Sequence, residues 1–88
     1  MRILIHNVEE AEGPALAQAT ERVLRFYGIK PGDDPNPALD KVDADVFCFP
    51  RQADGWLQYT LRLPYSEGGG MSVAMIQREP DAGWEFHS

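Results

Sequence analysis

Hydrophobic and polar residues recur along this chain with two different periods, and the change of period separates one helix from several strands. Residues 14–27 carry apolar side chains at three- and four-residue spacing, which predicts an amphipathic helix. Residues 56–65 alternate apolar and polar side chains, which predicts a strand. One face of that strand would hold Leu57, Tyr59, Leu61 and Leu63, and the other Trp56, Gln58, Thr60 and Arg62.

Four further segments have the composition of strands, namely 2–8, 46–51, 71–78 and 84–88. Residues 2–8 are apolar on both faces, so we expect a central strand covered from both sides. The run 65–72 contains Gly68, Gly69 and Gly70 between two predicted strands. A phosphate-binding loop needs a helix after its glycines, so this run predicts a hairpin tip instead.

These elements predict the fold class. Their order is β-α-β-β-β-β, and strands joined by short turns pair antiparallel. We therefore expect an α+β two-layer sandwich, in which one helix packs on a mostly antiparallel sheet of four to five strands. The length of 88 residues fits a single domain spanning residues 1–88.

The segment 30–45 is the longest irregular stretch, and we expect an acidic, proline-rich loop within the domain. Three prolines interrupt any regular pattern in it. An EF-hand is not indicated, because the glycine and the final glutamate of such a loop are missing. A solvated loop and a contact surface both remain as interpretations. The aspartates concerned are Asp33, Asp34, Asp40, Asp43 and Asp45.

The net charge of −6 bears on the kinds of partner that the chain can have. Its eight basic residues are scattered singly, so we expect no direct binding of nucleic acid. The apolar run at the N-terminus is too short for a signal peptide, and no stretch approaches the length of a membrane span. A single cysteine allows no intrachain disulfide. We therefore expect a soluble, cytoplasmic protein without a membrane partner.

Only three side chains offer a start for catalysis or metal binding, namely His6, Cys48 and His87. They are far apart in the sequence and form no pair at the spacing that zinc sites use. Cys48 stands between two phenylalanines in a predicted strand, which indicates an inert buried thiol rather than a nucleophile. We therefore expect no catalytic residue, no metal and no cofactor.

The remaining hypothesis is that the surface acts by binding. An acidic surface steers a protein toward a partner protein with a basic surface, including one that normally holds nucleic acid. We expect a small acidic, non-enzymatic interaction protein that binds and blocks a larger partner, as a phage-encoded inhibitor of a host defence system would. Alternatives are an immunity or antitoxin-type protein, a homo-oligomeric structural module such as a homodimer, and, third, a small ligand- or metal-binding enzyme. The expected contact residues are Asp33, Asp34, Asp40, Asp43, Asp45, Trp56 and Arg62.

Overall fold

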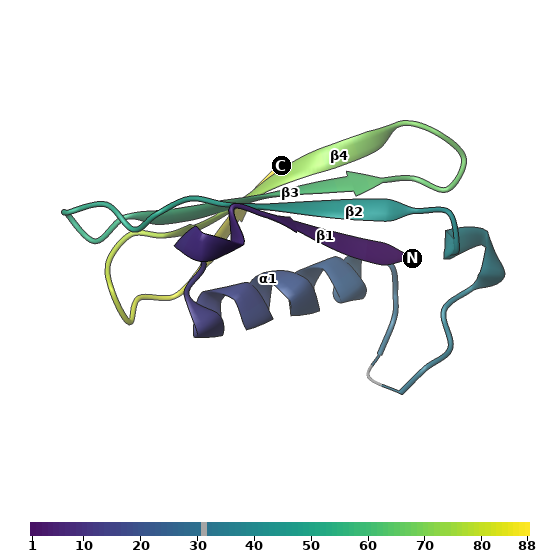
Figure 1. Ribbon diagram of the computed structural model, residues 1–88, viewed down its shortest axis with the longest axis horizontal. Helices are drawn as coiled ribbons and strands as arrows, with labels where there is room; N and C mark the ends of the chain where they lie inside the picture. Colours follow the sequence, from purple (N-terminus) through teal and green to yellow (C-terminus); the bar gives the residue numbers. More distant parts are fainter. Residues whose placement is uncertain (31) are drawn as a thin grey trace.

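The computed structural model describes residues 1–30 and 32–88 and shows one helix packed on a five-stranded sheet (Figure 1). The order of strands across the sheet follows their order in the chain. The elements are β1 (Arg2–His6), the 3-10 turn η1 (Val8–Glu10), α1 (Gly13–Phe26), the 3-10 turn η2 (Pro37–Leu39), β2 (Asp43–Cys48), β3 (Leu57–Pro64), β4 (Gly70–Gln77) and β5 (Glu85–His87).

The predicted fold class is confirmed, and the sheet is mostly antiparallel, as expected. β1 pairs parallel with β2, and the three other pairings are antiparallel. The expectation that residues 2–8 form a central strand is wrong, because β1 lies at an edge of the sheet. α1 covers one face of the sheet, and no other helix covers the opposite face in the part of the chain that is described (Figure 1).

α1 lies against the sheet through a row of small side chains. Ala15, Ala19 and Val23 recur at a four-residue spacing and are buried, which lets the helix backbone approach the strands. The helix ends at Phe26. Gly28 follows with a φ of 70°, the left-handed conformation expected just beyond a helix end. None of the described helices is long and apolar enough to cross a bilayer.

The core lies between α1 and the odd-numbered side chains of β3, as the alternation of residues 56–65 predicts. These four side chains are at most 1% exposed. The Tyr59 hydroxyl accepts a hydrogen bond of 2.7 Å from the Glu12 backbone N–H just before α1, so even the polar end of this buried ring is satisfied. The four residues are Leu57, Tyr59, Leu61 and Leu63.

The glycine run is a hairpin tip, as predicted. β3 and β4 pair in register from Leu57 with Gln77 to Pro64 with Gly70. The turn closes with a bond from the Tyr65 N–H to the Gly69 carbonyl, and Gly68 and Gly69 both have positive φ. A helix does not follow the glycines, so the tip lacks the geometry of a phosphate loop.

β2 begins earlier than the pattern of residues 46–51 indicated. It starts at Asp43 and ends at Cys48, and it lies between β1 and β3. Pro50 therefore stands beyond the strand, where it interrupts no ladder. This shift moves the last two aspartates of the acidic segment out of the connection and into the sheet.

Candidate functional site

The face of the sheet that α1 does not cover carries a continuous set of polar side chains. Register fixes its composition, because residues directly opposite one another on neighbouring strands point to the same side. Asp45 lies between Leu4 of β1 and Arg62 of β3, and Phe47 lies beside His6. We call this surface the open face. Its polar members include Arg2, His6, Asp43, Asp45, Gln58, Thr60, Arg62, Ser72, Glu85 and His87.

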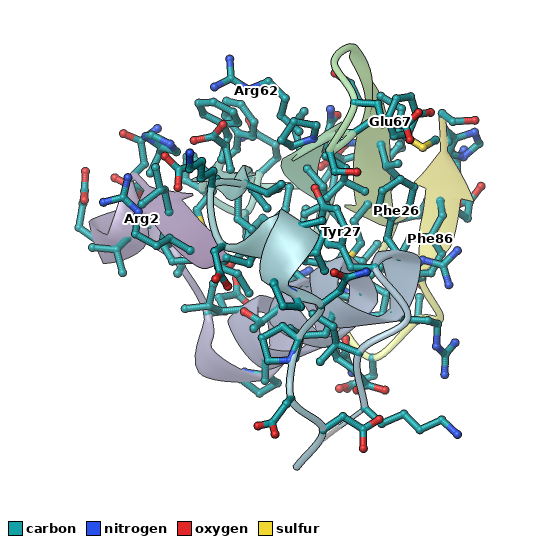
Figure 2. All side chains as sticks on the ribbon, turned by 90° about the vertical axis from the view of Figure 1, so that its right-hand side faces the viewer. Arg2, Phe26, Tyr27, Arg62, Glu67 and Phe86 are labelled. Atoms are coloured by element: carbon teal, nitrogen blue, oxygen red, sulfur yellow. The ribbon has the colours of Figure 1, made fainter. Side chains whose placement is uncertain are left out.

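Asp45 is the centre of the open face. It is only 3% exposed, although none of the described helices lies over it. His6 Nε2 lies 2.8 Å from Asp45 Oδ1, and Arg62 Nε donates to Asp45 Oδ2 at 2.8 Å. The side chains of His6 and Arg62 thus cover the carboxylate from both neighbouring strands. Figure 2 shows Arg62 projecting from the sheet on the side away from the helix.

The ionisation of Asp45 follows from two opposed effects. Burial alone would raise the pKa of its carboxyl group. Hydrogen bonds from His6 and Arg62, with the charge of Arg62, outweigh burial and lower the pKa below its usual value. Asp45 is therefore a carboxylate at neutral pH, and both of its oxygens have partners.

Two more ion pairs lie on the open face. Arg2 donates to both carboxylate oxygens of Asp43, at 3.0 and 2.9 Å. Arg78 pairs with Glu85, and its guanidinium carbon lies 4.8 Å from the centre of the Trp56 ring. Three arginines and three carboxylates therefore meet on this face, and their formal charges cancel.

A fourth ion pair joins three loops at one end of the sheet. Arg51 donates to both carboxylate oxygens of Glu12 at 2.9 Å, to the Gly55 carbonyl at 2.7 Å and to Gln77 Oε1 at 2.7 Å. Gln77 in turn donates to the Ala82 carbonyl at 2.9 Å. The loops are closely packed as well, because a Cβ added to Gly55 would lie 2.7 Å from Pro80.

We call this part of the molecule the clamped end. It consists of the segments 7–12, 49–56 and 78–84, which follow β1, β2 and β4 and lie together on the left of Figure 1. Five exposed carboxylates lie on these segments, and none of them forms an ion pair with another described residue. They are Glu9, Glu10, Asp54, Glu79 and Asp81.

The clamped end is where the net charge is least compensated. The four arginines already described cancel four carboxylates, so ten carboxylates and four cations carry the whole net charge of −6. All four of those cations lie elsewhere, on α1 or on the connection from α1 to β2. They are Arg22, Arg25, Lys30 and Lys41.

The predicted contact residues fall into three separate places. Asp33, Asp34 and Asp40 are exposed in the connection from α1 to β2, and this connection leaves the opposite end of the helix from the segment 7–12 (Figure 1). Three others lie on the open face in ion pairs, namely Asp43, Asp45 and Arg62. Trp56 is partly exposed in the segment just before β3, where the Arg78 guanidinium lies over its ring.

The three side chains considered for catalysis do not meet. His6 is on β1 and His87 on β5, at opposite edges of the sheet. Cys48 is fully buried on the side that faces α1, and burial followed by the charge of Glu9 raises the pKa of its thiol. Within the described residues, no group of three histidine, cysteine or carboxylate side chains is placed to hold a metal ion.

Sequence reasoning missed the Arg51 clamp and the grouping of the five carboxylates beside it. These carboxylates are spread from residue 9 to residue 81, and only the topology of the sheet brings their loops to one end. The available indication was the position of each acid just after a predicted strand. Comparison with protein-family models, with curated proteins and with solved structures finds no match to this chain.

Proposed function

We propose that this protein is a non-enzymatic interaction protein that binds a larger partner protein through a basic surface of that partner. One observation carries the proposal. Five carboxylates that form no ion pair with another described residue lie on three loops that Arg51 holds together at the clamped end. Fixed charges of one sign on a small surface raise the rate at which an oppositely charged protein associates.

The proposal gives a role to the hydrogen bonds by which Arg51 holds the loops together. A contact surface made of loops loses affinity when binding must first order those loops. Here the guanidinium of Arg51 spans Glu12, Gly55 and Gln77, and so it ties the loops to α1 and to β4 before any partner arrives. The backbone of the loops that carry the carboxylates is consequently ordered before a partner binds.

Blocking of the partner follows from the chemistry of the surface. A basic surface large enough to pair with the clamped end is typical of proteins that bind nucleic acid. A protein bound to that surface prevents nucleic acid from binding there. A phage-encoded inhibitor of a host defence system works in this way, and an immunity or antitoxin-type protein uses the same complementarity. In either case the partner is a protein, and this chain supplies negative charge.

The test compares two sets of three neutralising substitutions. Glu9→Gln, Glu10→Gln and Glu79→Gln remove charge from the clamped end at side chains that make no hydrogen bond or ion pair with another described residue. The matched control is Asp33→Asn, Asp34→Asn and Asp40→Asn, which removes the same charge from the opposite end.

The wild type and both variants are used to capture proteins from a host lysate, and association with each purified captured protein is timed by stopped flow at low and high salt. We expect the glutamate variant to associate about tenfold more slowly at low salt and the aspartate variant to match the wild type. Loss of association in the aspartate variant alone would move the contact to the connection before β2. Equal, salt-independent rates for all three proteins would overturn the proposal.

A homo-oligomeric structural module is the second candidate, and β1 is the observation that favours it. No strand of the described chain lies beside the outer edge of β1, and Ile3, Leu4 and Ile5 make this edge apolar. Unpaired edges of this kind pair with other chains. Sedimentation over a hundredfold range of concentration decides the matter, because a stable dimer in the absence of other proteins would replace the first proposal.

A further inference from the structure

The edge of the sheet opposite β1 is only partly closed. β5 pairs with Ala74, Met75 and Ile76, so within the described chain no strand lies beside the first part of β4. The direction of the backbone groups follows from the hairpin, in which the Gly69 carbonyl points toward β3. Because these groups alternate along an antiparallel strand, those of Gly70 and Ser72 point outward, where no described strand lies.

A groove runs beneath this free edge, between β4 and the C-terminal half of α1. Its volume is about 330 Å³. Its floor is apolar, and Phe86 is 41% exposed at its rim. Figure 2 shows Phe26 and Phe86 on the same side of the molecule, away from Arg2. The floor and rim include Phe26, Leu63, Met71, Val73 and Phe86.

The polar lining of this groove consists of Ser88 and of two arginines that form no ion pair with a described carboxylate. The other four arginines of the chain each form an ion pair. Arg22 and Arg25 form none with the described residues, even though Glu21 stands four residues before Arg25 in the chain. Arg22 instead lies over the Phe86 ring, with 4.3 Å between its guanidinium carbon and the ring centre.

We propose that this edge groove binds an extended, acidic segment of a partner protein, which pairs with β4 as an added strand. The backbone of the segment would bond with Gly70 and Ser72, in line with β5. Alternate side chains of the segment would then face α1. There an apolar side chain fits between Met71 and Phe86, and a carboxylate reaches Arg22 or Arg25. This surface is separate from the clamped end, and the inference does not depend on the proposed function.

The charge of the groove favours an acidic peptide over other occupants. The chain has a net charge of −6, but the groove carries two arginines without an ion pair to a described residue, so it is locally positive. A nucleic acid would need many phosphate contacts, and the acidic remainder of the surface repels it. A carboxylate on an extended segment needs only one guanidinium as its partner. Such a charged hydrogen bond is strong enough to form although the rest of the surface is acidic.

The probe is a fluorescein-labelled peptide of eight residues, with threonine at every second position and valine and glutamate alternating at the others. Its matched peptide has lysine in place of glutamate. We expect the glutamate peptide to bind, and the lysine peptide to bind at least tenfold more weakly, in fluorescence anisotropy titrations. In amide NMR spectra, the Gly70 and Ser72 signals should shift and exchange more slowly with bound peptide.

Variants of the protein separate the two parts of the proposal. The double substitution Arg22→Gln and Arg25→Gln should weaken binding at least tenfold, whereas Lys41→Gln, which removes a charge outside the groove, should not change it. Ser72→Pro removes the outward N–H but no bond to β3. If this variant does not fold, a peptide with methyl groups on alternate amide nitrogens serves instead. It cannot donate the backbone hydrogen bonds to β4, so it should bind more weakly to the wild-type protein.

Four results would overturn the proposal. They are equal affinity for the lysine peptide, NMR shifts confined to the clamped end, equally tight binding of an eight-nucleotide oligothymidine, and a concentration-dependent dimer that blocks the groove without peptide.

Discussion

The two faces of the five-stranded sheet differ in how much they contribute to the stability of the fold. On the side of α1, Leu61 and Val46 are fully buried and contribute through the area they remove from water. Their chain neighbours Arg62 and Asp45 lie on the open face and contribute through one ion pair. The comparison indicates that the helix side sets stability, while the open face can vary in its chemistry at a much smaller cost.

The largest expected effect comes from the helix side of β3. Leu61→Ala removes a fully buried side chain from the middle of the core, so we expect a loss of about 2–5 kcal/mol in the free energy of unfolding. Urea denaturation followed by tryptophan fluorescence measures it. Thr60→Ala, one residue away on the open face, is the control, and a loss there as large as that of Leu61→Ala would contradict the comparison.

An intermediate effect is expected at Asp45, and it depends on pH. The fold lowers the pKa of this carboxyl group, so its contribution is present above the pKa of the unfolded chain, about 3.9, and is lost as pH falls through the lower folded value. Asp45→Asn should cost about 1–2 kcal/mol at pH 7, near the low end for charged hydrogen bonds because the Arg62 side chain is largely exposed.

Denaturation at several pH values between 2 and 7 tests that expectation. The difference between wild type and Asp45→Asn should shrink toward pH 2. A difference that stays constant over this range would mean that Asp45 contributes through packing rather than through its charge.

The smallest effect is expected for Arg2, which pairs with Asp43 at the margin of the open face. Both side chains are in water, with exposed fractions of 73% and 39%, and such pairs add little to stability. Arg2→Gln should leave the midpoint of thermal unfolding unchanged within error in calorimetry. A clear fall in the midpoint would show that the open face stabilises the fold more than we infer.

Periodicity was enough to predict the helix and the inward side chains of β3, since both depend on local spacing. It could not predict that β1 lies at an edge. Ile3 and Ile5 pack toward α1, and Leu4 is half-buried on the open face beside the covered Asp45. A strand can therefore be apolar on both faces without a second layer above it.

The acidic segment shows the limit of sequence reasoning about the site. Its five aspartates were treated as one surface because they are close in the chain. Asp43 and Asp45 instead lie in β2, where cross-strand arginines neutralise them, and Asp33, Asp34 and Asp40 remain in the connection. Which acid meets a cation depends on strand pairing, and pairing between distant segments leaves no trace in local spacing.

The parallel pairing of β1 with β2 has a consequence for how the chain assembles. The connection between these strands, from Asn7 to Val42, is roughly seven times longer than the one that joins β3 to β4. Closing a flexible loop of that relative length costs about 1.8 kcal/mol more in chain entropy. The pairing of β1 with β2 is thus the step of sheet formation that closes the longest connection in the chain.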